Sequence, residues 1–143
     1  MNIDRAIEIA VSAHKGQVDK GGNPYILHPL RVMMSLDTEQ EMIVGVLHDV
    51  VEDSEWTFDD LKTEGFSDEI IEALNSVTKM ASEKGSDDGY FQFVRRAKQH
   101  AIGAKVKIAD LRDNLDVSRV SDLGEDDMKR INKYKWSLDF FSK

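Results

Sequence analysis

Apolar side chains recur at steps of three and four residues along most of this chain, which places them on one face of a helix. The clearest stripes lie in residues 3–14 and 70–77. The same spacing predicts helices at about 28–36, 39–53, 89–100, 102–116 and 125–141. Thr57 and Ser67 are typical N-caps, because acidic residues follow each of them. No alternating run is long enough to predict a strand.

The breaks between these stripes are rich in turn-forming residues. The run 15–24 contains three glycines and a proline, and it is the most loop-like stretch of the sequence. Residues 81–89 are rich in Ser, Gly, Glu, Lys and Asp, and they predict a mobile surface loop. Thr38 and Glu41 form a capping-box pattern before the helix expected at 39–53. The pattern therefore predicts one domain over residues 1–143, an all-α bundle of about six to eight helices.

Composition narrows the classes of function. With 19 Lys and Arg against 27 Asp and Glu, the formal charge is -8, so no overall field attracts nucleic acid or an anionic membrane. The absence of cysteine excludes disulfides, iron–sulfur clusters, thiolate zinc sites and thiol catalysis. No apolar run approaches the ~20 residues of a membrane span, and no basic signal region leads the chain. We therefore expect a cytoplasmic protein without nucleic-acid or membrane partners.

Polar groups interrupt several apolar stretches, and together they have the composition of a metal site. His28 stands at the start of an apolar helix, and the pair His48-Asp49 lies inside the apolar stretch 43–51. Asp110 sits in the middle of another apolar helix. A shared divalent cation would remove the cost of half-burying these groups. Two imidazoles and two carboxylates without a thiolate favour Mn²⁺ or Fe²⁺, with Zn²⁺ as a third option.

Each of these residues also has a plain structural explanation. Taken alone, His48 would be a core histidine that is hydrogen-bonded to backbone, and Asp110 would cap a bend. Glu52 and Asp53 lie one helical turn beyond His48 and Asp49, and alone they would form a solvated helix end. Taken together, separate polar exceptions in apolar settings favour the shared cation.

Several motifs resemble those of HD-domain metal-dependent phosphohydrolases, because His28, the pair His48-Asp49 and a distant Asp110 match the H…HD…D signature of that class. The match is closer to one branch, the hydrolase half of the RelA/SpoT family and its small alarmone hydrolases. That resemblance rests on five blocks in family order: AHKGQ (13–17), GNPYILHP (22–29), LHDVVED (47–53), VTK (77–79), and VKIAD with Asn114 (106–114).

The resemblance implies an all-helical bundle that holds one Mn²⁺ and removes pyrophosphate from the 3′ position of guanosine tetra- and pentaphosphate. By motif position, the metal ligands would be His28, His48, Asp49 and Asp110. Glu52 and Asp53 would position and deprotonate the attacking water, which is chemistry that a carboxylate pair beside a cation can perform. Lys20 and Asn114 would contact the nucleotide.

A polyanionic substrate needs a local basic rim on a chain of this net charge. The candidates are Lys15, Lys20, Arg31, Lys105 and Lys107. Most of them are equally well explained as ordinary surface charges. Lys20 is the strongest candidate because it lies in the glycine-rich run 15–24, which we call the glycine loop, close to Pro24 and Tyr25.

Two positions depart from the family pattern, and both concern nucleotide recognition. Asp19 stands where the alarmone hydrolases usually carry an arginine that lies against the guanine ring, and an acid cannot make that cation–π contact. Val117 stands where a threonine usually follows the asparagine. One alternative is therefore an HD phosphohydrolase that acts on another nucleotide or on a 2′- or 3′-phosphate dinucleotide. A non-catalytic regulator that binds metal or nucleotide is a second alternative. The sequence predicts no oligomeric state.

Overall fold

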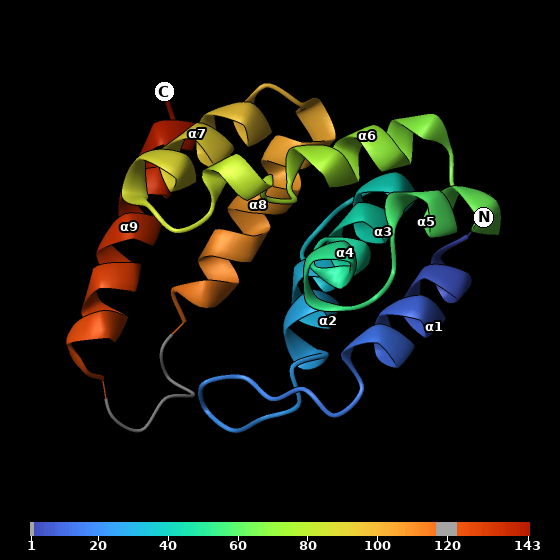
Figure 1. Cartoon of the computed structure of the whole chain (residues 1–143), viewed down its shortest axis with the longest axis horizontal. Helices are drawn as coiled ribbons and strands as arrows, with labels where there is room; N and C mark the ends of the chain where they lie inside the picture. The colour runs from blue at the N-terminus through green and yellow to red at the C-terminus, as the bar shows by residue number, and fades with distance from the viewer. Residues whose placement is uncertain (1, 117–122) are drawn as a thin grey trace.

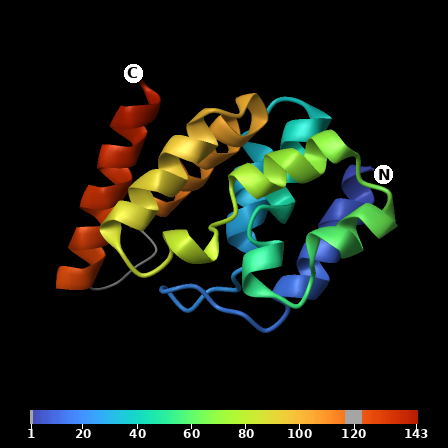
Figure 2. The ribbon, with the colours of Figure 1, turned by 45° about the horizontal axis from the view of Figure 1, so that its top comes forward.

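The computed structural model describes residues 2–116 and 123–143, and the regular elements in these two ranges are all helical (Figures 1 and 2). They are α1 (Ile3–His14), α2 (Leu27–Met34), α3 (Glu39–Leu47), α4 (Val50–Asp53), α5 (Phe58–Glu64), α6 (Asp68–Ser76), the 3₁₀ turn η1 (Ala81–Glu83), α7 (Asp87–Lys98), α8 (Ala101–Asn114) and α9 (Glu125–Phe141). The predicted all-α class is confirmed. None of the described helices is long and apolar enough to cross a membrane.

Helix α3 lies at the centre of the bundle, where it packs against α1, α2, α6 and α8 (Figure 1). It is apolar on nearly every side, as expected of a helix that is enclosed by others. Gly45 allows α2 to approach closely, because a Cβ at this position would lie 2.7 Å from a methyl carbon of Leu36 and 3.5 Å from the Cα of Met33. This close packing brings the start of α2 and the end of α3 together, and these are the segments that carry His28 and His48.

A second, smaller apolar cluster joins α7 to α9, and α9 lies at one edge of the molecule (Figure 2). Tyr90, Phe93 and Val94 are buried there, and Tyr134 and Phe140 of α9 pack against them. Helix α9 also packs along α8. The last helix is therefore held beside the helix that carries Asp110.

The helix predicted over residues 39–53 is divided in two. The capping box of Thr38 and Glu41 opens α3 as expected, but α3 ends at Leu47 and the single turn α4 begins at Val50. Asp49 has φ -105° and ψ 0°, and its carboxylate does not cap α4. It accepts a hydrogen bond from the hydroxyl of Tyr25 instead. A tertiary contact thus coincides with the break, and helical periodicity alone carries no sign of it.

The prediction of a surface loop over residues 81–89 is only partly right, because most of the segment is exposed but it is not a loop throughout. This segment contains η1 and the first turn of α7. Glu83 is only 3% exposed, and both of its carboxylate oxygens accept hydrogen bonds from Arg96, at 2.8 and 3.1 Å. The charged composition resembles a solvated loop because the partner of Glu83 lies 13 residues further on. The predicted N-caps Thr57 and Ser67 are confirmed, since each side chain accepts from a backbone N–H of the following helix.

Candidate functional site

Four side chains from three separate segments meet in the interior. His28 lies on α2, His48 and Asp49 lie between α3 and α4, and Asp110 lies on α8. Each offers one ligand atom, and these four atoms all lie within 4.8 Å of one another. The two histidines and Asp110 are each at most 6% exposed. The structure thus brings together all four residues that the sequence predicted as metal ligands.

His48 carries the clearest sign that the cluster fits a cation. Its Nδ1 donates to the carbonyl of Gly45 at 2.6 Å, which leaves Nε2 as an acceptor in the neutral ring. Nε2 is buried without a hydrogen bond, although carboxylate oxygens of Asp49 and Asp110 lie 3.0 and 3.3 Å away. Burial opposes a charge on this ring, but the two carboxylates raise the pKa of His48 well above its ordinary value. A cation between these atoms would replace the proton that they attract.

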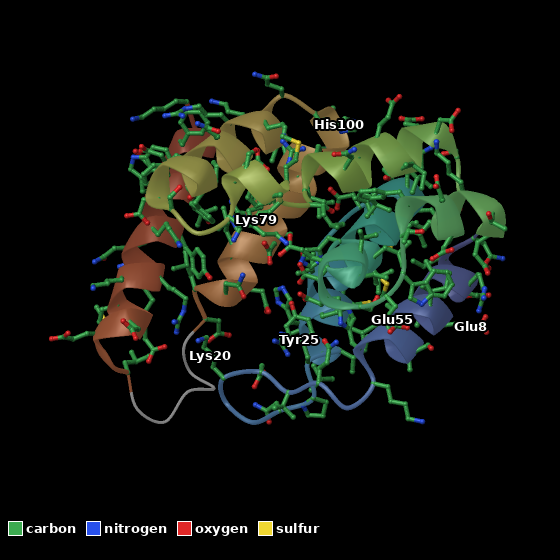
Figure 3. All side chains as sticks on the ribbon, viewed as in Figure 1. Glu8, Lys20, Tyr25, Glu55, Lys79 and His100 are labelled. Carbon is green, nitrogen blue, oxygen red and sulfur yellow. The ribbon has the colours of Figure 1, made fainter. Side chains whose placement is uncertain are left out.

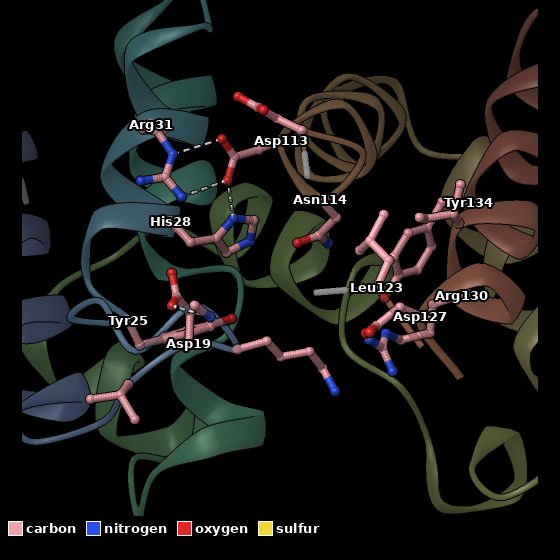
Figure 4. Close-up of a pocket in the computed structure, with 15 residues that line it drawn as sticks. Asp19, Tyr25, His28, Arg31, Asp113, Asn114, Leu123, Asp127, Arg130 and Tyr134 are labelled. Carbon is pink, nitrogen blue, oxygen red and sulfur yellow. Dashed lines mark hydrogen bonds and ion pairs between the residues drawn. The ribbon is translucent and has the colours of Figure 1, made fainter. Parts of the chain in front are cut away.

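His28 is oriented by a carboxylate on its other side (Figure 4). Its Nδ1 lies 2.6 Å from Oδ2 of Asp113, while Nε2 lies 2.9 Å from Oδ1 of Asp110. Arg31 holds Asp113 with two hydrogen bonds, at 2.7 and 3.0 Å. These donors lower the pKa of Asp113 against the opposing effect of burial. A histidine that donates Nδ1–H to a carboxylate presents Nε2 as a ligand.

Asp110 is anchored on both oxygens. Oδ1 accepts from the amide of Asn114 at 3.1 Å, and Oδ2 accepts from the ammonium group of Lys107 at 2.9 Å. Burial opposes its charge, but Lys107 and the nearby His48 keep the pKa of Asp110 well below its ordinary value. Asp110 is therefore ionised and fixed in place, as a metal ligand requires.

The predicted water-activating pair lies on α4, next to this cluster. Both side chains are exposed, and Glu52 accepts a hydrogen bond from the backbone N–H of Lys79 at 3.0 Å. Although Asp53 is exposed, nearby protein atoms partly remove water from its carboxylate. This desolvation, together with repulsion from Asp49 and Glu52, raises the pKa of Asp53 to about 6. A carboxylate with a raised pKa is a better proton acceptor near neutral pH than an ordinary aspartate.

The backbone beside Asp53 is tied to the first helix. His14 is 1% exposed, and its Nδ1 lies 2.9 Å from the side-chain oxygen of Gln17. The amide nitrogen of Gln17 in turn donates to the carbonyl of Asp53 at 2.9 Å. His14 is thus packed in the interior, and the hydrogen-bond chain through Gln17 ties α1 to the carbonyl of Asp53 at the end of α4.

A pocket of about 410 Å³ opens beside His28 and extends to α9 (Figure 4). This volume lies within the range of small-molecule sites. The pocket is lined by Val18, Asp19, Lys20, Gly21, Tyr25, His28, Arg31, Asp113, Asn114, Asp116, Leu123, Asp127, Arg130, Ile131 and Tyr134. It therefore joins the glycine loop, the candidate metal ligand His28 and the last helix.

The predicted substrate contacts divide into two groups. Lys20 and Asn114 line the pocket. Lys15 is exposed at the end of α1 and does not line it, whereas Lys107 is buried against Asp110. The carboxylate of Asp19 accepts from two backbone N–H groups of its own loop, at 2.9 Å each. Val117 lies outside the described residues.

Several residues of the site were not predicted from the sequence. Tyr25 bonds Asp49, Asp113 orients His28, and Arg130 and Tyr134 bring α9 into the pocket. The last two stand four residues apart on one helix face, but the same spacing is common on solvated helices. Only Tyr25 had a sequence signal, since it belongs to the GNPYILHP block.

Comparison with known proteins extends over most of the chain. A family model described as an HD domain matches residues 6–123. The guanosine-3′,5′-bis(diphosphate) 3′-pyrophosphohydrolase of Aquifex aeolicus is 31% identical over 136 residues, which cover 92% of this chain and 19% of that protein. A GTP pyrophosphokinase of Streptomyces coelicolor is 33% identical over 126 residues, covering 82% of this chain and 15% of its own length. The chain thus spans less than a fifth of these two relatives.

A solved structure has a similar fold. It is that of a metazoan orthologue of SpoT, described as hydrolysing ppGpp, and it superimposes with a TM-score of 0.81. The match covers 97% of this chain and 84% of the other, at 20% sequence identity. At that identity the likeness establishes the helical fold, while the chemistry rests on the residues of the site.

Proposed function

Since this chain belongs to the HD-domain family, we propose that it is a metal-dependent phosphohydrolase that removes pyrophosphate from the 3′ position of guanosine tetra- or pentaphosphate. The observation that carries this proposal is the buried Nε2 of His48, which faces two carboxylates without a hydrogen bond. The carboxylate pair Glu52 and Asp53 stands beside it, and a pocket opens next to His28. The relatives named above support the choice of substrate.

The ion that we propose is Mn²⁺, held by His28, His48, Asp49 and Asp110. Ligands of mixed nitrogen and oxygen character, without a thiolate, suit Mn²⁺ or Fe²⁺ better than soft metals, and they also accept Zn²⁺. When bound, the ion supplies positive charge to the phosphate and acidifies the attacking water.

The protein groups of the proposed reaction have separate roles. Asp53 takes the proton of the attacking water, and its pKa of about 6 suits that role near neutral pH. Glu52 is held by the backbone N–H of Lys79 and orients the water. Attack at the phosphorus breaks its bond to the 3′ oxygen, which keeps the electron pair and takes up a proton. The products are pyrophosphate and a nucleotide with a free 3′-hydroxyl, which is a 5′-diphosphate from the tetraphosphate and a 5′-triphosphate from the pentaphosphate.

The test is the hydrolysis of guanosine tetraphosphate by the Mn²⁺-loaded chain, with pyrophosphate and orthophosphate measured separately. We expect pyrophosphate and GDP as products. Glu52→Gln and Asp53→Asn should each lower kcat while the bound Mn²⁺ stays unchanged. Glu55→Gln is the matched control, because Glu55 is exposed in the segment that follows α4. Normal turnover by both Glu52→Gln and Asp53→Asn would reject the assigned roles, and turnover of no nucleotide would favour a non-catalytic binder.

One observation favours a second candidate substrate. The carboxylate of Asp19 accepts hydrogen bonds from backbone N–H groups of its own loop. This acidic residue occupies the position where the family places an arginine against guanine. A related phosphohydrolase reaction on another nucleotide would tolerate this change. The same assay with NADPH and nucleoside monophosphates separates the two candidates. Faster release of orthophosphate from NADPH than of pyrophosphate from guanosine tetraphosphate would favour the second.

A further inference from the structure

Three lysines from different segments surround one aromatic ring. The ammonium nitrogens of Lys133, Lys79 and Lys107 lie 4.4, 5.3 and 5.8 Å from the centre of the Tyr90 ring. Lys79 and Lys107 also lie 6.0 and 4.7 Å from the ring of Phe93. Lys107 is buried and the other two are half-buried. We call these three residues the lysine cluster.

The lysine cluster has more positive charge than its surroundings neutralise. Lys107 is paired with Asp110, but Lys79 and Lys133 form no ion pair with a carboxylate in ranges 2–116 and 123–143. Burial and repulsion from Lys107 and Lys133 lower the pKa of Lys79, although Glu52 opposes this. Aromatic faces stabilise such cations only partly. Because the chain as a whole has a charge of -8, this local excess of positive charge indicates a site for an anionic ligand.

The lysine cluster borders the groups assigned to the reaction. Lys107 bonds one oxygen of Asp110, whose other oxygen faces His28. The backbone N–H of Lys79 bonds Glu52. In Figure 3, Lys79 lies between the ribbons of α7 and α4, and Lys20 lies below it. A ligand on the lysine cluster would thus lie next to the metal ligands and the water-activating carboxylates.

The pocket beside His28 has a different charge balance. Its lining includes four carboxylates, Asp19, Asp113, Asp116 and Asp127, against three cations, Lys20, Arg31 and Arg130. Arg31 and Arg130 are already paired with carboxylates of that lining. The pocket therefore suits the nucleoside better than a group with several negative charges.

We propose that the lysine cluster binds the diphosphate group that the substrate loses and holds it as product pyrophosphate before release. This inference rests on the proposed function, from which it takes the identity of the substrate. It adds the orientation in which that substrate binds. The nucleoside occupies the pocket beside His28, and the scissile diphosphate points toward Lys79 and Lys133. An ammonium group has three donors for phosphate oxygens, and the surrounding aromatic rings exclude water that would screen these contacts.

The test is calorimetric binding of inorganic pyrophosphate and of GDP to the full chain in EDTA, so that neither hydrolysis nor metal loading is required. Lys79→Gln and Lys133→Gln should each weaken pyrophosphate binding about tenfold and leave GDP binding unchanged. Lys79→Arg should retain most of the affinity. Lys135→Gln is the matched control, because Lys135 is exposed on the same helix as Lys133. The melting temperature of Lys79→Gln should not fall, because this variant removes a repelling charge.

Each outcome separates this inference from the proposed function. Pyrophosphate binding that is absent in the wild type, or equal in Lys79→Gln, Lys133→Gln and Lys135→Gln, would overturn the lysine cluster as a diphosphate site. An equal loss of GDP affinity would overturn the assigned direction, because the 5′-diphosphate would then occupy the lysine cluster. Selective loss of pyrophosphate binding without any alarmone hydrolysis would support the site and reject the proposed function.

Discussion

Replacing Asp113 by alanine should weaken metal binding about 100-fold, although this residue is not itself a ligand. The carboxylate accepts from His28 Nδ1 at 2.6 Å and from Arg31 at 2.7 and 3.0 Å. Partners of this kind contribute typically about 10- to 100-fold to metal affinity, because they fix the tautomer and orientation of the ligand. Asp113→Ala removes the whole acceptor and leaves Arg31 without its partner. The upper limit corresponds to about 2.7 kcal/mol.

A graded series tests this reasoning. Asp113→Asn keeps a neutral acceptor for Nδ1, so we expect about a tenfold loss, or about 1.4 kcal/mol. Arg31→Gln keeps the carboxylate but loses the double hydrogen bond that orients it, so its loss should be the smallest. Asp139→Ala is the control, because the Asp139 side chain is 70% exposed and its ion pair with Lys143 lies on the surface.

The assay is competition for Mn²⁺ between the protein and a fluorescent chelator, with bound metal measured independently after equilibrium dialysis. Thermal unfolding of each metal-free variant separates lost affinity from lost folding. The reasoning is refuted if Asp113→Ala, folded, binds Mn²⁺ as tightly as the wild type and the Asp139→Ala control. An Asp113→Asn variant weaker than Asp113→Ala would also contradict it.

Three further outcomes are expected. The hydrolysis rate should fall as pH drops below about 6.5, because the histidines that would hold the metal must be neutral to bind it, and Asp53, whose pKa is raised to about 6 in the metal-free chain, loses its function as an acceptor when it gains a proton; a flat profile across that range would contradict this. Glu83→Gln should lower the free energy of unfolding in urea by about 3 kcal/mol, because Arg96 would lose its buried partner. That stabilisation should be present above the unfolded pKa of about 4.3 and be lost as pH falls, since the pKa of Glu83 is lowered in the folded chain; equal acid sensitivity of wild type and variant would argue against it. Gly89→Ala should lower the free energy of unfolding by about 2 kcal/mol in the same urea assay, because a Cβ there would lie 2.6 Å from the backbone oxygen of Glu83. An unchanged urea midpoint would contradict this, because the backbone at Glu83 would then move to make room.

The candidate site was partly accessible from the sequence. His28, His48, Asp49 and Asp110 could be identified because polar groups in apolar stretches need compensation, whatever the tertiary arrangement. Asp113 could not, because it lies 85 residues from His28 and resembles a solvated residue near a helix end. Arg130 and Tyr134 were missed for the same reason, since nothing local distinguishes a pocket wall from an ordinary helix surface.

Glu83 shows why composition misled the prediction at residues 81–89. A glutamate in a segment rich in Ser, Gly and Lys is usually solvated, and its burial depends on Arg96 arriving from the next helix. Similarly, the division between α3 and α4 coincides with Tyr25 bonding Asp49. Both errors arose where a contact between distant segments outweighed local preference.

The sequence by itself determined most of the helices and the side chains of the candidate metal site, because helical periodicity, N-caps and the cost of burying charge act within a few residues. Tertiary structure alone decided which carboxylate orients His28, which helix forms the far side of the pocket, and that three lysines meet around Tyr90. The physical reason is that hydrogen bonds and unscreened charges act over a few ångströms. Helix packing determines which distant residues come within that range.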